Sequence, residues 1–150
     1  MRRHGEPIVI LVADDDADDR ILIKEALEEN RLANDLHFVV DGEQLIDYLY
    51  HRGEFTNMDE TPRPGLILLD LNMPKKDGRE ALREIKSDPE LRKIPVVVLT
   101  TSKADTDIGN IYELGANSFV AKPVTFDSLV NVMKVIKSYW FEIVQLPVKK

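Results

Sequence analysis

The chain has 150 residues, of which 43% are hydrophobic and 31% are charged, with a formal net charge of −7 and no cysteine. This length fits one domain with a buried core, and this composition does not fit a disordered chain. The lack of cysteine excludes a disulfide framework, a thiol nucleophile and a cysteine-ligated metal. The acidic balance argues against nucleic-acid binding. We expect one domain over residues 1–150, with its core over about 7–141 and a short C-terminal tail.

The N-terminal segment does not have the pattern of a signal peptide. A basic start leads into an apolar run over residues 8–13, but three aspartates follow at once and no small-residue cleavage site is present. The apolar run is also too short to cross a bilayer. We therefore expect a soluble, cytoplasmic protein without a membrane partner.

Short apolar runs alternate with helical patterns along the chain. Each run is too short for a stable helix, and near-continuous apolarity is typical of a parallel strand buried on both faces. The runs cover residues 8–13, 36–40, 66–69, 95–99 and 119–121, and helices are expected over 16–30, 42–52, 78–87, 104–114 and 126–142. This alternation predicts an α/β fold with one open, doubly wound parallel sheet and helices on both faces.

Local signals mark several helix ends. Asp41 and Asp77, each followed by glycine, are expected to open helices, and Asp16 is expected to cap the first helix. Pro89 ends another helix, because the residue before a proline avoids the helical region. Residues 53–64 predict a long loop, which is most simply a tolerated surface insertion.

Acidic side chains directly follow two of the predicted strands. Asp14 and Asp15 follow the first strand, and Asp70 follows the third at a point where no helix starts. Because the carboxyl ends of the strands form one crevice in a doubly wound sheet, we expect these carboxylates to converge. Like charges so close repel each other, and Mg²⁺, which prefers a few carboxylates with waters and a phosphate, would remove that repulsion.

Two further strand ends carry a hydroxyl group and an ammonium group. Thr100 ends the fourth predicted strand, and Lys122 follows the fifth. They offer a hydrogen-bond donor and a positive charge to phosphoryl oxygens. Each is ordinary alone, but together with the three aspartates they form a specific pattern.

These residues carry a resemblance to the response-regulator receiver domains of two-component signalling, over residues 7 to about 140. It implies a five-stranded, flavodoxin-like (βα)5 fold with strand order 2-1-3-4-5, as in chemotaxis regulators. It also implies a phosphoacceptor that catalyses its own phosphorylation and slow dephosphorylation, and not a dedicated enzyme. The matching segments are Leu11-Val12-Ala13-Asp14-Asp15-Asp16, Leu68-Leu69-Asp70-Leu71-Asn72-Met73-Pro74, Asp77-Gly78, Val97-Val98-Leu99-Thr100, Gly115-Ala116 and Lys122-Pro123.

The resemblance implies a role for each site residue. Asp70 would accept a phosphoryl group from a histidine kinase. The Mg²⁺ site at Asp70 would include Asp15 as a direct ligand, Asp14 largely through water and Asn72 through its backbone carbonyl. Thr100 and Lys122 would hold the phosphoryl oxygens, Thr100 and Phe119 would form the switch, and Lys122-Pro123 would be the family's cis peptide bond.

A narrower resemblance is to single-domain regulators that are paired with phytochrome-type histidine kinases. It implies such a kinase as a partner, and it rests on the 53–64 loop and on segments 74–80, 85–89, 99–102, 139–141 and 146–147. One departure from the family is Thr101, which stands where the family often has a very small residue. Its branched side chain either obstructs an attacking water or points away from the site.

The last predicted helix carries two apolar faces. One stripe is expected to be core, and it consists of Phe126, Leu129, Val130, Met133, Ile136, Trp140 and Ile143. Val132, Val135 and Tyr139 extend apolarity onto a second face, and exposed apolar surface of that kind usually marks an interface. We predict a homodimer through the fifth helix and the C-terminal tail; the competing interpretation is a monomer whose tail covers this face.

Three other classes of function fit the sequence less well. A Mg²⁺-dependent phosphohydrolase usually carries a second aspartate two residues after its nucleophile, where this chain has Asn72. A phosphate-independent pseudo-receiver would not need the full set of acidic, hydroxyl and lysine residues. A nucleotide-binding protein would need a glycine-rich phosphate loop after the first strand.

Overall fold

The computed structural model describes residues 9–30, 35–57, 60–100, 115–116, 118–123 and 125–138. The helix expected at 104–114, Thr101 and the tail from residue 139 onward lie outside this part of the chain. The side chains of Thr100 and Phe119 also lie outside it, although their backbones belong to strands.

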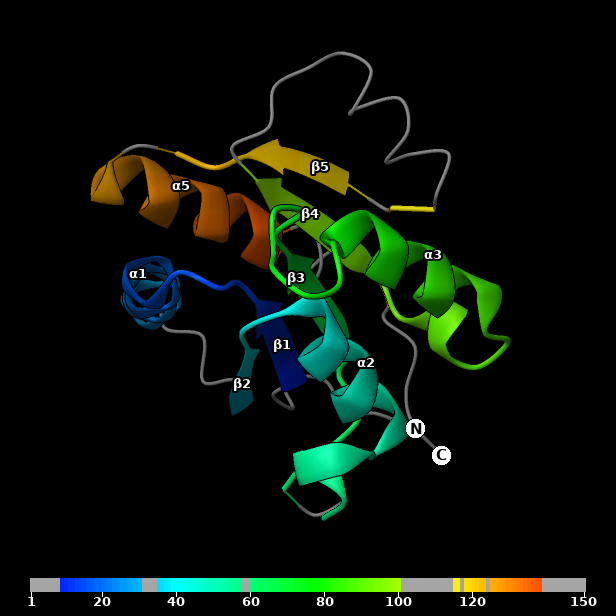
Figure 1. The fold of residues 1–150 in the computed structure, drawn as a ribbon. Coiled ribbons are helices and arrows are strands. Elements are labelled where there is room, and N and C mark those ends of the chain that lie inside the picture. The colour runs from blue at the N-terminus through cyan, green and yellow to red at the C-terminus, as the bar shows by residue number, and fades with distance from the viewer. Residues whose placement is uncertain are drawn as a thin grey trace.

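Five parallel strands form one sheet in the order β2-β1-β3-β4-β5, which confirms the predicted topology (Figure 1). β3 lies at the centre, and all four of its residues are buried, as expected for a strand covered on both faces. The strands are β1 (Val9–Ala13), β2 (Asp35–Val39), β3 (Leu66–Leu69), β4 (Val96–Thr100) and β5 (Ser118–Ala121).

The described helices begin where the sequence predicts them. The side chains of Asp16, Asp41, Asp77 and Thr125 each accept a hydrogen bond from a backbone N–H in the first turn of the helix that follows. These helices are α1 (Ala17–Glu29), α2 (Gly42–Tyr50), α3 (Gly78–Ser87) and α5 (Phe126–Ile136), with 3₁₀ turns η1 (Gly53–Phe55) and η2 (Leu91–Lys93). None of them is long and apolar enough to cross a membrane.

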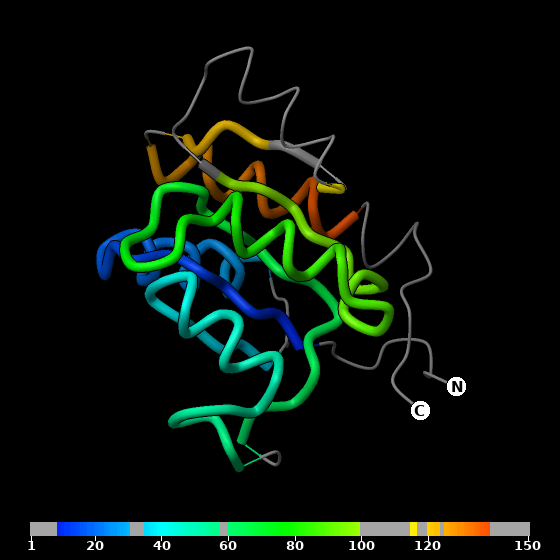
Figure 2. Tube along the Cα trace, turned by 45° about the vertical axis from the view of Figure 1, so that its right-hand side comes forward, coloured from blue at the N-terminus to red at the C-terminus, as the bar shows by residue number. Residues whose placement is uncertain are grey.

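Two helical layers enclose the sheet, and each packs on its own core. α1 and α5 lie together on one face, and α2 and α3 lie on the other (Figures 1 and 2). Along β1, Ile10 and Val12 face the α1 and α5 layer, while Leu11 and Ala13 face the other. In α5 the stripe expected to be core is buried at Leu129, Met133 and Ile136 and partly buried at Val130. Phe126, at the start of the same stripe, is 37% exposed, so that part of the prediction is wrong, and Trp140 and Ile143 lie outside the described residues.

The segment after α2 is tied to the domain more firmly than a simple insertion. Thr61 is buried and donates a hydrogen bond to the Asn57 carbonyl at 2.9 Å, and the Tyr48 hydroxyl donates to the Pro62 carbonyl at 2.9 Å. Phe55 packs against the core. The segment lies at the end of α2 away from the loop that follows β3 (Figure 2).

The end of α2 differs from its predicted position. The helix was expected to reach residue 52, but it ends at Tyr50, and His51 adopts a left-handed conformation with φ of 57°. The ring nitrogen Nδ1 of His51 lies 3.0 Å from the Thr61 hydroxyl. This contact stabilises the turn of the chain after α2. The order of apolar and polar residues alone does not predict such a contact.

Candidate functional site

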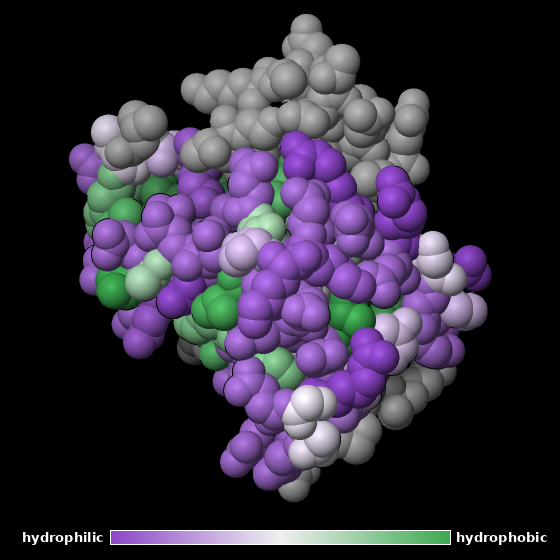
Figure 3. Space-filling model, in the orientation of Figure 1, coloured by the Kyte–Doolittle hydropathy of each residue, from purple (hydrophilic) through white to green (hydrophobic). Residues whose placement is uncertain are grey.

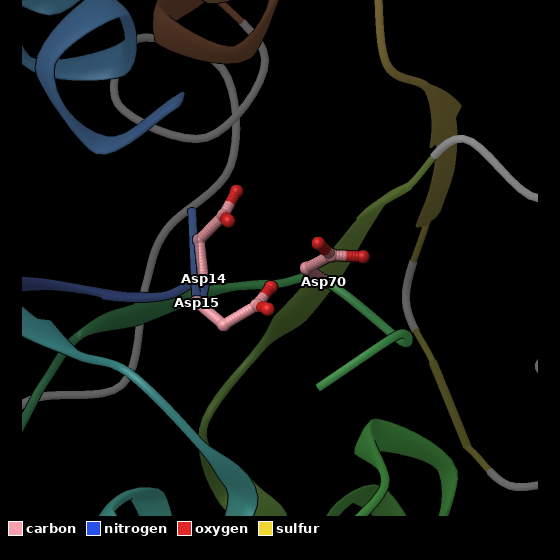
Figure 4. Close-up of side chains that lie close together, drawn as sticks. All are labelled: Asp14, Asp15 and Asp70. Carbon is pink, nitrogen blue, oxygen red and sulfur yellow. The ribbon is translucent and has the colours of Figure 1, made fainter. Parts of the chain in front are cut away.

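Three carboxylates meet at the carboxyl ends of β1 and β3 (Figure 4). β1 and β3 are neighbours, and the backbone N–H of Asp70 donates to the Ala13 carbonyl at 2.9 Å. One oxygen from each of Asp14, Asp15 and Asp70 lies within 4.8 Å of the others. Asp14 and Asp70 are buried and Asp15 is exposed, so the group forms a pocket that opens to solvent. The predicted convergence of these side chains is confirmed.

Burial opposes the negative charge of Asp14. Burial raises the pKa of this carboxyl, and hydrogen bonds from Lys122 Nζ to Oδ2 at 2.8 Å and from the Asp16 N–H to Oδ1 at 2.9 Å offset only part of that effect. The charge of Asp70 adds to the rise. A cation bound between these groups would relieve both costs.

Lys122 brings positive charge into the same pocket. Its Nζ lies 2.8 Å from Asp14 Oδ2, 2.8 Å from Asp19 Oδ2 and 3.2 Å from Asp70 Oδ2. Burial disfavours the charge on Lys122, but the hydrogen bonds to Asp14 and Asp19 and the negative charges of Asp14 and Asp70 outweigh it, so the pKa of Lys122 is raised. The side chain is therefore an ammonium at neutral pH.

The peptide bond after Lys122 differs from the expected one. No peptide bond between described residues is cis, so Lys122-Pro123 is trans and the implied cis bond is wrong for this structure. A trans bond before proline is the form favoured by about 0.5–1 kcal/mol. The lysine nevertheless reaches the carboxylates from the end of β5.

The loop after β3 fixes the orientation of Asp70. The backbone N–H of Asn72 donates to Asp70 Oδ1 at 3.1 Å, and the Gly78 N–H donates to the Leu71 carbonyl at 2.9 Å. A side chain at Gly78 would place its Cβ 2.6 Å from the Asp70 carbonyl oxygen, so the loop lies directly on the start of α3. Asp70 caps no helix, because α3 begins eight residues later.

Thr100 and Phe119 lie on the two strands that complete this edge. Thr100 pairs with Ala121, the residue before Lys122, and Phe119 pairs with Val98 one strand away. The backbone therefore places Thr100 at the same end of the sheet as Asp70. Their implied role in switching stays a prediction.

Sequence reasoning missed Asp19, the third carboxylate on Lys122. Asp16 caps α1 by accepting from the N–H groups of Asp18 and Asp19, which places Asp19 in the first turn. Helical side chains point back toward the N-terminus, so an acidic residue here can reach over the pocket from which the helix starts. That position relative to the cap is the signal that would have found it.

The fold and this pocket define a class of protein. The response regulator receiver domain family matches residues 10–134, and the chain belongs to that family. It is the receiver domain of a response regulator and not a dedicated enzyme.

Particular relatives support a narrower likeness. The chain is 44% identical to response regulator Rcp1 of Synechocystis sp., over 94% of each chain. It is 38% identical to the probable methanogenesis regulatory protein FilR2 of Methanothrix harundinacea, over 90% of this chain and 84% of that one. The phosphorylated cyanobacterial phytochrome response regulator RcpA superposes with a TM-score of 0.88 at 42% identity, covering 95% of this chain and all of that chain.

A solved relative also bears on the metal. The Mn²⁺-bound form of Rcp1 superposes with a TM-score of 0.85 at 43% identity, covering 95% of this chain and all of that chain. Receiver domains bind a divalent metal at the acidic pocket, and Asp14, Asp15 and Asp70 supply the hard oxygen ligands that such an ion needs.

Proposed function

We propose that Asp70 accepts a phosphoryl group from the phosphohistidine of a histidine kinase in a Mg²⁺-dependent reaction. The observation that carries this proposal is the position of Asp70 Oδ2, 3.2 Å from Lys122 Nζ and in one cluster with Asp14 and Asp15. A phosphorus–oxygen bond forms to the Asp70 carboxylate while the phosphorus–nitrogen bond breaks. The departing imidazole keeps the electron pair of that bond and takes up a proton.

The residues of the chain contribute position and charge. The Asn72 N–H holds Asp70 Oδ1, which leaves Oδ2 facing Lys122 as the attacking oxygen. The Lys122 ammonium then stabilises the charge on the transferring group, which is the main form of catalysis for phosphoryl transfer. Mg²⁺ held by these carboxylates would supply further positive charge to the transferring group.

We assign the metal ligands from this geometry together with the likeness to receiver domains, and the switch residues from that likeness alone. Asp15 is exposed at the mouth of the pocket and suits a direct ligand, while Asp14 is already engaged by Lys122 and suits a contact through water. By the same likeness, the Asn72 carbonyl would be the third direct protein ligand, after the carboxylates of Asp15 and Asp70. After phosphorylation Thr100 would bond the phosphoryl group and Phe119 would turn inward, a shift between two populated states.

The partner of this reaction is a protein. The likeness to Rcp1 and to the phytochrome response regulator RcpA supports a phytochrome-type kinase as the donor. We place the reaction in the cytoplasm, where a kinase has ATP. Output would pass through protein contact, including a homodimer through α5 and the tail, for which the exposed Val135 is the structural support.

Labelling with a small phosphoryl donor tests the assignment of Asp70. The protein is incubated with phosphoramidate or acetyl phosphate, with Mg²⁺ and separately with EDTA, and intact-protein mass spectrometry counts the groups added. We expect one phosphoryl group with Mg²⁺, none with EDTA and none in Asp70→Asn. Equal labelling of Asp70→Asn would show that another residue is the acceptor.

A further inference from the structure

The Asp19–Lys122 contact is the part of the pocket that the proposed reaction does not use. Asp19 Oδ2 lies as close to Lys122 Nζ as Asp14 Oδ2 does, at 2.8 Å, and closer than Asp70 Oδ2 at 3.2 Å. Yet Asp19 is not in the group of three carboxylates whose oxygens could share an ion. It contacts the lysine without being placed to bind the metal.

The first turn of α1 fixes Asp19 relative to the pocket. Asp16 Oδ1 accepts from the Asp19 N–H at 3.2 Å, and the Asp16 N–H donates to Asp14 Oδ1 at 2.9 Å. A short chain of hydrogen bonds therefore runs from the metal-binding carboxylate to the backbone of Asp19. Its side chain is 30% exposed and that of Lys122 is 10% exposed, so the contact lies at the rim of the pocket.

Metal and phosphoryl binding change what Lys122 can contact. Asp14 and Asp70 are carboxylates that the metal needs, and an ammonium resting on both competes with a cation for them. Asp19 offers Lys122 a third oxygen that the metal does not need. With Asp19 as an anchor, the Lys122 ammonium would stay at the pocket while the carboxylates of Asp14 and Asp70 remain available to the metal.

We propose that Asp19 is a positioning residue that anchors the Lys122 ammonium at the rim of the acidic pocket, where it meets the phosphoryl group without blocking the metal-binding carboxylates. The proposal rests on the proposed function of Asp70 for its phosphoryl part. Without the anchor, a long flexible lysine side chain has more rotamers to lose when it meets the phosphoryl group. The ammonium would then contact only Asp14 and Asp70, where it competes with the metal for their oxygens.

A double-mutant cycle on the full chain tests this role. The proteins are wild type, Asp19→Asn, Lys122→Met and the double variant, and Asp18→Asn, an exposed neighbour in the same turn, is the matched control. Thermal unfolding first establishes that each is folded. Calorimetric Mg²⁺ titration and the rate of phosphoramidate labelling at saturating Mg²⁺ are then measured.

We expect Asp19→Asn to slow labelling about tenfold, the size of one charge-assisted hydrogen bond, and to weaken Mg²⁺ binding several-fold. Asp18→Asn should change neither by more than about twofold, as for an exposed charge. In the Lys122→Met background, Asp19→Asn should have no further effect on either quantity. An equal effect in both backgrounds would show that Asp19 acts only through its charge and would overturn the positioning role.

A direct spectroscopic readout keeps this test separate from that of the proposed function. In metal-free protein, the ¹⁵N-labelled ammonium of Lys122 should give a signal protected from exchange, because three carboxylates surround it. Asp19→Asn should lose most of that protection and Asp18→Asn should keep it. Unchanged protection in Asp19→Asn overturns the anchor even if Asp70 is labelled, and failure of wild-type labelling with the signal behaving as expected overturns the phosphoacceptor role alone.

Discussion

At the scale of single residues, the adjacent aspartates Asp15 and Asp16 have different roles. Asp15 offers an oxygen to the shared carboxylate group, whereas Asp16 accepts from the N–H groups of Asp18 and Asp19 and caps α1. We expect Asp15→Ala to weaken Mg²⁺ binding much more than Asp16→Ala does. Asp16→Ala should instead lower the free energy of unfolding by about 0.5–2 kcal/mol, the usual loss for a cap.

Two measurements on the same pair of variants separate these effects. Calorimetric titration with Mg²⁺ ranks the metal affinities, and urea unfolding without metal ranks the stabilities. If both variants lose metal affinity equally, Asp15 is not the direct ligand.

The buried carboxyl of Asp14 should make stability depend on pH and on metal. Its pKa is raised by burial, so the folded protein binds this proton more tightly than the unfolded chain does. The contribution of Asp14 to the free energy of unfolding therefore increases as pH falls from 7 toward the ordinary carboxyl pKa of about 4. Asp14→Asn removes the penalty of the buried charge, and Lys122 keeps Asp19 and Asp70 as partners.

We therefore expect metal-free Asp14→Asn to be more stable than wild type at pH 7, by about 1 kcal/mol, the usual size of a single-substitution effect. The difference should shrink as pH falls toward 5. Saturating Mg²⁺ should favour wild type, because binding stabilises the folded state. Urea unfolding at pH 5 and 7, with and without Mg²⁺, checks this. A less stable variant at pH 7 without metal would mean that the Asp14–Lys122 pair outweighs the burial cost.

At the scale of elements, the loop that carries Asp70 is pressed between two helix starts. A Cβ at Gly42, the first residue of α2, would lie 2.0 Å from the Lys76 carbonyl oxygen, and one at Gly78 would lie 2.6 Å from the Asp70 carbonyl oxygen. Alanine in place of glycine inside a helix gains about 1 kcal/mol from helix propensity. A clash with backbone at 2.0 Å should outweigh that gain.

We expect Gly42→Ala to lower the free energy of unfolding by about 1–3 kcal/mol, as overpacking does, and to slow Asp70 labelling because the loop after Asp70 must move. Glu43→Ala is the matched control, since Glu43 is exposed in the same helical turn. Urea unfolding and the labelling rate are compared for both variants. A Gly42→Ala protein as stable as Glu43→Ala would show that the loop yields without cost.

The sequence predicts an element well when the residues that define its ends are part of the element or next to it. β3 and α3 match their predicted bounds, since an apolar run and the Asp77-Gly78 and Asp88-Pro89 pairs are local signals. The left-handed His51 was missed because that conformation usually selects glycine or asparagine.

The sequence also predicted only part of the candidate site. Asp14, Asp15 and Asp70 could be placed together because the topology of a doubly wound sheet brings the ends of its strands to one edge. The contact of Asp19 with Lys122 joins residues 103 positions apart and depends on the rotation of α1, which no strand-end rule supplies.

At the scale of the whole molecule, exposed apolar side chains gather on the α1 and α5 side. Val135 on α5 is 67% exposed and Ile21 on α1 is 54% exposed, while Leu129, Met133 and Ile136 fill the core beneath α5. Most of the face in Figure 3 is hydrophilic, and its hydrophobic residues form separate patches. Val132, expected on the second apolar face, is partly buried against the core, so the exposed face is narrower than the sequence predicted.

The exposed Val135 makes a homodimer through α5 the proposal to test at this scale. An exposed apolar face on a charged surface usually marks an interface. In a two-fold dimer, one self-complementary patch buries this face on both subunits. We expect wild type to sediment as a dimer at tens of micromolar, the range of a modest interface. Val135→Glu should sediment as a monomer that still unfolds cooperatively. Lys24→Gln, at an exposed position on α1, makes the same change in net charge and should stay dimeric.

If wild type and Val135→Glu are both monomers, the dimer is excluded, and the α5 face is covered by the tail or by another protein. If both are dimers, the interface lies elsewhere on the molecule.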